Sequence, residues 1–240
     1  MSKVFDWFQI LLISIATVFC GTLVILLVPI GQRNSIRISS FLWSRMLLGI
    51  CGVKLEIEGE ENVDPNHTRI YISNHQSNID IPVVFKAIPV PLFFIAKQEL
   101  KKMPFLGWAM MAVGMIFIDR FHRDKAFASI RQAGKEIKRG KNVVSFPEGT
   151  RSRNGKIQMF KRGTFILAVE NDIEVVPVAL YGAEKIIPPG KFEIHPGVIK
   201  VAIGKPISPI PWKGKNEVEA FAKHCQHTIV EMRDQLEASA

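Results

Sequence analysis

An uncharged, apolar run near the N-terminus most constrains what this chain can fold into. No charged residue occurs from Trp7 to Gln32, and the stretch from Ile10 to Ile30 is almost continuously apolar. About 20 such residues suffice for a helix to cross the hydrocarbon core of a bilayer. The run is longer than the apolar part of a secretory signal peptide, and no small-residue cleavage pattern follows Pro29. We therefore expect a retained membrane-binding helix.

The residues that follow this run are basic and have the sidedness of a second helix. Four arginine and lysine residues lie between the run and the next acid, Glu56, so the positive-inside rule predicts that the rest of the chain lies on the cytoplasmic side. Within residues 34–50 most apolar side chains share one helical arc. The opposite arc and its N-terminal flank carry Arg33, Arg37, Ser40 and Ser44. We expect an interfacial helix, with a buried core helix as the alternative. Residues 1–54 are thus predicted to anchor the chain to a membrane.

Residues 55–240 are predicted to form one α/β catalytic domain. Short apolar runs alternate with helical stretches, which is typical of a layered α/β fold with a mixed, largely parallel sheet. The predicted strands are 55–57, 69–73, 92–96, 115–118, 142–146, 174–180 and 198–203. The predicted helices are 79–87, 105–113, 125–139, 163–169 and 216–236.

The charge balance indicates an anionic partner. The chain has 31 Lys and Arg against 22 Asp and Glu, for a net charge of +9. Because the N-terminus is apolar, a phospholipid surface or a phosphorylated substrate is favoured over nucleic acid. The three cysteines form no CxxC pair and the histidines have no ligand-like spacing, so neither a disulfide framework nor a metal site is predicted.

The loop Asn74-His75-Gln76-Ser77-Asn78-Ile79-Asp80 follows a predicted strand and carries the first candidate chemistry. A histidine with an acid five positions later can form a pair in which the carboxylate orients the imidazole as a general base. The same spacing fits a helix capping box with Ser77 at the N-cap, and spacing alone leaves both interpretations open. No GxSxG motif occurs, which argues against covalent serine catalysis.

The loop Phe146-Pro147-Glu148-Gly149-Thr150-Arg151-Ser152 follows another predicted strand and lies in a basic region. Ten Lys or Arg occur from 131 to 162 against two glutamates, which suits a phosphate or an anionic headgroup. Gly149 permits close approach of the backbone to a ligand. A third segment, 114–120, places Asp119-Arg120 after an apolar strand, where a structural ion pair is the commoner explanation.

Four segments, NHQSNID, GMIFIDR, FPEGTRS and VPVAL, in this order and at these separations, resemble the sequence blocks of the glycerolipid acyltransferases. The resemblance covers about Leu55 to Lys205. It implies transfer of an acyl group from acyl-CoA or acyl-carrier protein to the sn-2 hydroxyl of lysophosphatidic acid (1-acylglycerol 3-phosphate), giving phosphatidic acid. No cofactor or metal is implied, and no covalent intermediate. The implied location is the inner membrane, with the catalytic domain on its cytoplasmic face.

The resemblance also implies roles for individual residues. His75 matches the catalytic base and Asp80 its orienting acid, which favours catalysis over capping. The remaining matches form a substrate-binding set, consisting of Glu148, Gly149, Thr150, Arg151, Arg120, Lys97 and Lys161. Arg120 and Arg151 are expected to hold the acceptor phosphate.

Other functions remain open from the sequence. The acceptor could be glycerol 3-phosphate or another lysolipid, because these blocks are shared across acceptors. A thioester hydrolase would use His75 and Asp80 on water. A protein that binds anionic lipids without catalysis is the third alternative.

Overall fold

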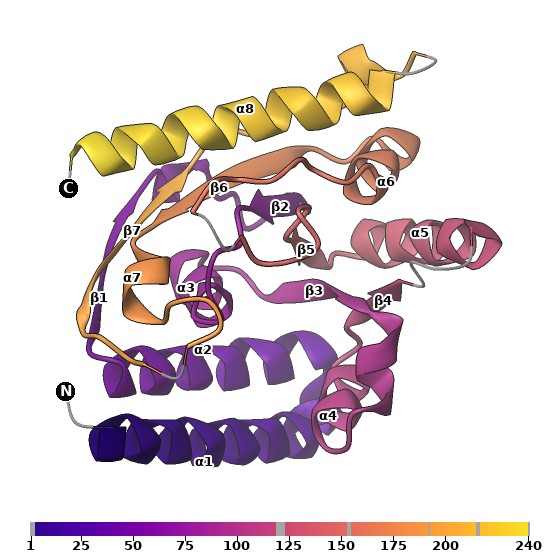
Figure 1. Ribbon diagram of the computed structural model, residues 1–240. Helices are drawn as coiled ribbons and strands as arrows, with labels where there is room; N and C mark the ends of the chain where they lie inside the picture. The colour runs from indigo at the N-terminus through magenta and orange to yellow at the C-terminus, as the bar shows by residue number, and fades with distance from the viewer. Residues whose placement is uncertain (1–2, 119–122, 153–154, 192, 215–216, 240) are drawn as a thin grey trace.

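A seven-stranded sheet organises the computed structural model, which describes residues 3–118, 123–152, 155–191, 193–214 and 217–239 (Figure 1). The strand order is β1-β7-β6-β2-β5-β3-β4. The strands are β1 (Val53–Glu58), β2 (Ile70–Ser73), β3 (Leu92–Lys97), β4 (Ile116–Ile118), β5 (Asn142–Ser145), β6 (Val175–Tyr181) and β7 (Gly197–Ile203). Each predicted strand is therefore present, within a residue or two of its predicted ends.

The sheet is mixed and largely parallel, as predicted. The five strands β6, β2, β5, β3 and β4 run in one direction. The strand β7 pairs antiparallel with β6, and β1 pairs parallel with β7. The central strands β2, β5 and β6 are buried along their whole length, which explains why apolar residues follow one another in them without alternation.

Helices cover both faces of the sheet (Figure 1). They are α1 (Lys3–Leu27), α2 (Gln32–Ile50), α3 (Asp80–Ala87), α4 (Leu106–Ala112), α5 (Arg123–Lys138), α6 (Gly163–Asn171), α7 (Ala183–Ile186) and α8 (Glu217–Ala238). The helices α5, α6 and α8 share one core with residues such as Ile70 and Ile72. Tyr71 points to the opposite face, toward α2 and α3, because side chains alternate along a strand.

The sequence did not predict α7 or the short 3₁₀ segments. Four 3₁₀ segments are described, at Val28–Ile30, Glu60–Asn62, Gln98–Lys102 and Ile210–Trp212. The last of these lies in a proline-containing stretch between the predicted strand 198–203 and the predicted helix 216–236. Elements of three to five residues are too short for an apolar period to show.

The helices α1 and α2 form a hairpin that packs on the sheet domain (Figure 1). The α2 side chains Ile36 and Leu48 are buried, and Val24 of α1 shares a cluster with Phe93 of β3. Among the described residues, Phe5–Ile30 is the one helical stretch long and apolar enough to cross a membrane, with a mean hydropathy of 2.8 and 17% of its window buried.

The predicted sidedness of α2 was partly wrong. Ser44 was placed on the polar arc, yet it is fully buried, and Ser35 and Ser39 are buried as well. The Ser35 hydroxyl donates to the Val24 carbonyl of α1 at 2.6 Å, and the Ser44 hydroxyl donates to the Phe41 carbonyl. Small hydroxyl side chains that satisfy themselves on helix carbonyls can enter a close helix–helix contact. The arginines do face outward, as predicted.

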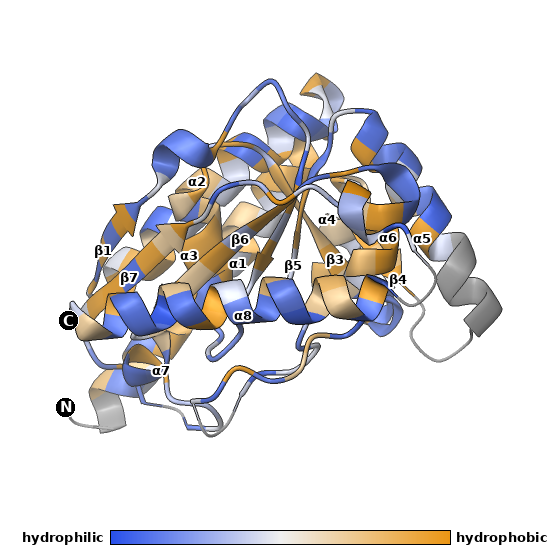
Figure 2. Ribbon diagram, turned by 90° about the horizontal axis from the view of Figure 1, so that it is seen from above, coloured by the Kyte–Doolittle hydropathy of each residue, from blue (hydrophilic) through white to orange (hydrophobic). Residues whose placement is uncertain are grey.

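The outer surfaces of α1 and α8 differ in character. Figure 2 shows α8 with interleaved hydrophilic and hydrophobic residues in front of largely hydrophobic strands. Its apolar residues Phe221, Cys225 and Ile229 are buried against the sheet. By contrast, α1 leaves Trp7 and Leu26 more than half exposed. The outer side of α8 is therefore suited to water and the outer side of α1 to an apolar phase.

Candidate active site

The two predicted catalytic residues lie together just beyond the carboxyl end of β2. His75 Nδ1 is 2.7 Å from Asp80 Oδ2, and the side chains are 16% and 1% exposed. A carboxylate only accepts hydrogen bonds, so His75 Nδ1 donates to Asp80, and in the neutral imidazole with this tautomer Nε2 is the nitrogen with the lone pair. Within the described part of the chain, Nε2 makes no hydrogen bond. The pair therefore has the geometry of an oriented general base.

Asp80 is held by more than the histidine. Its Oδ2 also accepts the backbone N–H groups of Gln76 at 2.7 Å and Ser77 at 2.8 Å. The Ser77 hydroxyl donates to the Ile187 carbonyl and is not a side-chain cap of α3, which begins at Asp80. Of the two capping-box bonds, the one from the Ser77 N–H to the Asp80 carboxylate is formed, whereas the serine hydroxyl does not cap the helix. Orientation of His75 and local capping are combined in one carboxylate.

Glu148 joins the two candidate loops to each other. Its Oε1 accepts the His75 backbone N–H at 2.6 Å, and its Oε2 accepts the Gln158 N–H at 2.8 Å. The residue is 1% exposed, and burial raises the pKa of its carboxyl group, partly offset by the two N–H donors. Charge-assisted bonds of this kind contribute about 1.5–3 kcal/mol each. These contacts position the His75 loop, whereas a contact from Glu148 to substrate remains a prediction.

Two residues that the sequence did not single out also fix the His75 loop. The Asn74 side chain accepts the Leu180 N–H at 2.8 Å and donates to the Leu180 carbonyl at 2.9 Å. This ties the first sequence block to β6, where the fourth block lies. Gln76 is fully buried and donates to the Gly155 carbonyl at 2.8 Å. The signal in the sequence that could have identified Asn74 and Gln76 is their position on either side of His75 in the first block.

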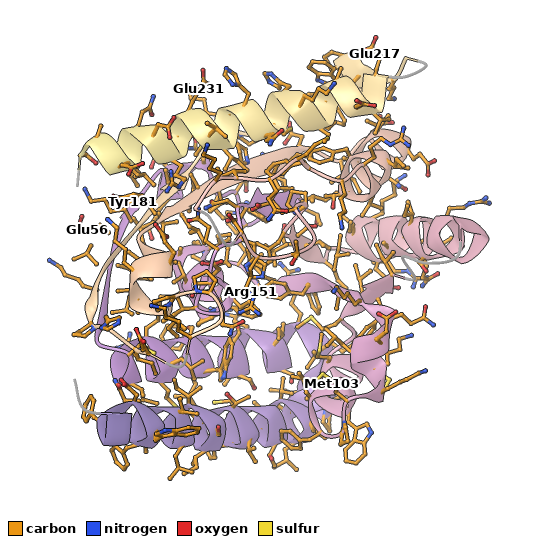
Figure 3. The ribbon with its side chains drawn as sticks, in the orientation of Figure 1. Glu56, Met103, Arg151, Tyr181, Glu217 and Glu231 are labelled. Atoms are coloured by element: carbon orange, nitrogen blue, oxygen red, sulfur yellow. The ribbon has the colours of Figure 1, made fainter. Side chains whose placement is uncertain are left out.

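The predicted substrate-binding residues that the structure describes lie at the same edge of the sheet. Ser152 N–H donates to the His75 carbonyl at 2.9 Å, so Arg151 lies one residue from a direct contact with the histidine. Figure 3 labels Arg151 in the middle of the face drawn. Lys161 N–H donates to the Pro147 carbonyl, and its side chain crosses Gly149.

Gly149 has a φ of +74°, and a Cβ there would lie 2.7 Å from Lys161 Nζ. A side chain at this position would therefore be strained and would displace the lysine. Thr150 is exposed in the same loop. Lys97 is exposed at the carboxyl end of β3, the neighbour of β5. Arg120 lies outside the described residues.

A series of contacting aromatic rings connects His75 to the N-terminal hairpin. The His75 ring stacks on Phe146 with centroids 4.2 Å apart and an interplanar angle of 18°. Phe146 is followed by Phe94 at 5.9 Å, Phe85 at 5.1 Å and then Trp43 of α2 at 6.1 Å. All four of these rings are partly exposed, so they form an apolar track between the base and α2.

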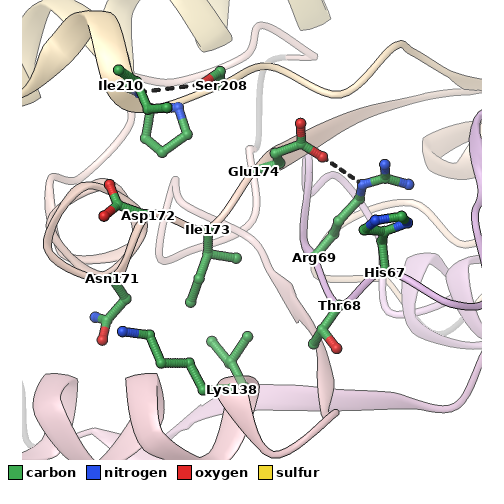
Figure 4. Close-up of a pocket in the computed structure, with 12 residues that line it drawn as sticks. His67, Thr68, Arg69, Lys138, Asn171, Asp172, Ile173, Glu174, Ser208 and Ile210 are labelled. Carbon is green, nitrogen blue, oxygen red and sulfur yellow. Dashed lines mark hydrogen bonds and ion pairs between the residues drawn. The ribbon is translucent and has the colours of Figure 1, made fainter.

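A hollow of about 590 Å³ lies at the other edge of the sheet (Figure 4). It is lined by residues before β2 and β6, among them Arg69 and Glu174, whose Nε and Oε2 atoms are 2.9 Å apart. The sequence-predicted site residues do not line it. In parallel α/β sheets the ligand site lies at the carboxyl ends of the strands, so the chemistry is assigned to the His75 edge.

The comparisons with known proteins agree with this site. The family model described as acyltransferase matches residues 54–181, which include both candidate loops. The chain therefore belongs to the acyltransferase family.

Individual relatives share a narrower name. The chain is 36% identical over 156 residues to the chloroplastic 1-acyl-sn-glycerol-3-phosphate acyltransferase LPAT1 of Arabidopsis thaliana, covering 64% of this chain and 44% of the relative. It is 29% identical over 206 residues to the Escherichia coli (strain K12) 1-acyl-sn-glycerol-3-phosphate acyltransferase, covering 85% and 82%. The chain spans less than half the length of the first three curated relatives that it matches.

A solved structure shares the whole architecture. The crystal structure of the 1-acyl-sn-glycerophosphate (LPA) acyltransferase PlsC from Thermotoga maritima superposes with a TM-score of 0.83 at 26% identity. The match covers 98% of this chain and 95% of that chain. The shared fold therefore includes the N-terminal hairpin as well as the sheet.

Proposed function

We propose that this protein transfers an acyl group from an acyl thioester to the sn-2 hydroxyl of 1-acylglycerol 3-phosphate, forming phosphatidic acid. The observation that carries the proposal is the buried His75–Asp80 pair beside a basic loop, in a member of the acyltransferase family. The relatives described above are named for this reaction, which supports the choice of acceptor.

The chain's own residues account for the steps. His75 Nε2 takes the proton of the acceptor hydroxyl as the oxygen attacks the thioester carbonyl, and Asp80 stabilises the imidazolium that forms. The tetrahedral intermediate then expels the thiolate, which takes the proton from His75. A thioester is already activated, so no enzyme nucleophile is required. The three cysteines are buried, and burial raises the pKa of Cys51 to about 11 and of Cys225 to about 12, which keeps both thiols protonated.

The basic loop is proposed to hold the acceptor phosphate. Arg151 offers a planar pair of donors that matches a phosphate, and Lys161 and Lys97 add point charges at the same edge. Arg120 is retained as a further ligand on the strength of the sequence. We expect neither a metal nor a cofactor to take part, and the thioester is a co-substrate supplied as acyl-CoA or acyl-carrier protein.

The N-terminal hairpin is proposed to lie in the cytoplasmic leaflet of the inner membrane. The exposed side of α1 is apolar, whereas α2 is attached to α3 and to the sheet domain. Because α1 packs along α2 and α2 packs on the sheet domain, the hairpin is better suited to lying in one leaflet than to crossing both. The aromatic track from Trp43 to His75 then gives acyl chains an apolar path to the base.

The test is an acceptor panel with the purified full-length protein in detergent. Lysophosphatidic acid, glycerol 3-phosphate and other lysolipids are each supplied with a labelled acyl thioester, and the labelled lipids are separated. We expect phosphatidic acid from lysophosphatidic acid and little product from the others. Free fatty acid formed equally fast without acceptor would indicate a hydrolase. Product formation that is unaffected by His75→Ala would show that His75 is not the general base.

A further inference from the structure

An exposed phenylalanine on α2 is flanked by cations from two helices. Phe41 is 53% exposed, with Arg45 Cζ 5.4 Å and Lys86 Nζ 5.6 Å from its ring centroid. Arg37 is exposed one helical turn before Phe41, so Arg37, Phe41 and Arg45 form one stripe on α2. We call Arg37, Phe41, Arg45 and Lys86 the Phe41 cluster.

The positive charge of the Phe41 cluster is not neutralised by neighbouring acids. The helix α2 contains no Asp or Glu, and the one acid of α3 is Asp80, which is bound to His75. Within the described part of the chain, none of the three cations forms an ion pair. Three unpaired cations around an exposed ring are therefore available to an anion.

The position of α2 indicates where this anion comes from. The helix lies between α1, whose outer side is apolar, and α3 of the sheet domain (Figure 1). Ile38 is exposed beside Arg37, so apolar and basic side chains alternate on the outer stripe of α2. If α1 lies in the acyl-chain region, α2 lies at the depth of the headgroup phosphates. Phenylalanine suits the acyl boundary there and arginine suits the phosphates.

We propose that the Phe41 cluster binds the headgroups of anionic phospholipids, with Arg37, Arg45 and Lys86 on phosphate oxygens and the Phe41 ring among the upper acyl carbons. This inference rests on the proposed membrane position of the hairpin. It adds a preference for anionic lipid to the apolar insertion of α1. Each basic side chain near an anionic surface strengthens binding roughly fivefold, so three together give roughly a hundredfold.

The experiment measures binding of the full-length protein to two kinds of vesicle. One kind is phosphatidylcholine alone, and the other is phosphatidylcholine mixed with phosphatidylglycerol; flotation gives the partition coefficient for each. The test variant is R37Q/R45Q/K86Q. The matched control is R131Q/K135Q/K138Q on α5, which removes the same charge from exposed positions on the opposite face of the sheet.

We expect the wild-type protein to prefer the anionic vesicles and R37Q/R45Q/K86Q to lose most of that preference while binding phosphatidylcholine like the wild type. The control should keep most of the preference. R37K/R45K retains the charge and should keep it as well, which separates loss of binding from misfolding. An equal loss in the α5 control, or an undiminished preference in R37Q/R45Q/K86Q, would overturn the proposal.

Activity in detergent separates this inference from the proposed function. R37Q/R45Q/K86Q should form phosphatidic acid from detergent-dispersed lysophosphatidic acid at the wild-type rate, because the cluster is not part of the proposed catalytic machinery. A wild-type protein without this activity would contradict the proposed function and leave the vesicle result to be judged by itself.

Discussion

The described part of the chain contains two histidine–aspartate pairs with nearly the same contact and very different surroundings. His75 Nδ1 is 2.7 Å from Asp80 Oδ2, and His67 Nδ1 is 2.5 Å from Asp64 Oδ2. The first pair is 16% and 1% exposed, whereas the second is 69% and 38% exposed. The first follows the carboxyl end of β2, and the second precedes its amino end.

The difference shows that a short contact does not by itself make a catalytic pair. Asp80 is fixed by two backbone N–H groups and its histidine loop by Glu148, so the imidazole has one orientation. Asp64 accepts the Asn66 N–H in an exposed turn, and this bond, more than the neighbouring His67, lowers the pKa of Asp64. Water screens the exposed pair, whereas burial and preorganisation strengthen the other.

The largest expected effect comes from removing the buried base. His75→Ala should lower turnover by about 10²–10⁴-fold, the usual range for a lost general base. The free energy of unfolding should change little by comparison. Steady-state phosphatidic acid formation checks this, with His67→Ala as the matched control. A comparable loss in His67→Ala would show that the two pairs do not differ as described.

Asp80→Asn should lower turnover by less than His75→Ala, because the imidazole remains but its orientation and charge stabilisation are impaired. It should also destabilise the fold by about 1–3 kcal/mol, since an amide replaces a buried acceptor of two N–H groups. Turnover and urea unfolding are measured on the same preparation, beside Asp64→Asn. Full turnover with a large loss of stability would assign Asp80 to capping alone.

Arg151→Ala is expected to raise KM for lysophosphatidic acid by about 10–100-fold, the equivalent of one charge-assisted hydrogen bond. KM for the acyl thioester should change much less. Arg151→Lys should recover only part, since an ammonium lacks the planar donor pair. Equal changes for both substrates would indicate that Arg151 supports the loop and not the phosphate.

Glu148→Gln gives a smaller, pH-dependent effect. Burial raises the pKa of Glu148 above its ordinary value of 4.5, so ionisation of this group costs the folded state stability. The contribution of Glu148 to the free energy of unfolding is fully present below pH 4.5 and is lost as the pH rises through the raised pKa. The gap in unfolding free energy between wild type and Glu148→Gln should narrow over this interval. A gap that widens with pH would show that the two N–H donors outweigh burial.

The smallest effect is expected at the exposed pair. Asp64→Asn and His67→Ala should leave turnover unchanged, and the urea midpoint at neutral pH should not move measurably. Because the pKa of Asp64 is lowered, its small contribution is present above pH 3.8 and disappears as the pH falls through the lowered pKa. Urea midpoints from neutral to acid pH check this, and a clear loss at neutral pH would contradict it.

The fold was predictable from the sequence where the signal is local. The buried strands contain short apolar runs such as residues 175–180, and each strand was located from the sequence alone. The prediction failed where a contact joins distant segments. Ser44 was placed on the polar arc of α2, yet it is buried, because burial by segments elsewhere in the chain leaves no trace in the amphipathic period. The aromatic track joins Trp43, Phe85, Phe94 and Phe146, which lie in four separate parts of the chain and have no shared motif.

The sequence by itself determined the apolar N-terminal helix, the alternation of strands and helices, and the spacing that lets His75 meet Asp80. Each depends on residues a few positions apart, so hydrophobic period and loop length are enough to define it. Only the tertiary structure decided that Glu148 uses both oxygens on backbone N–H groups and that Asn74 binds β6. These bonds exist because the sheet order sets β2 between β5 and β6, and that order is fixed by packing between residues far apart in the chain.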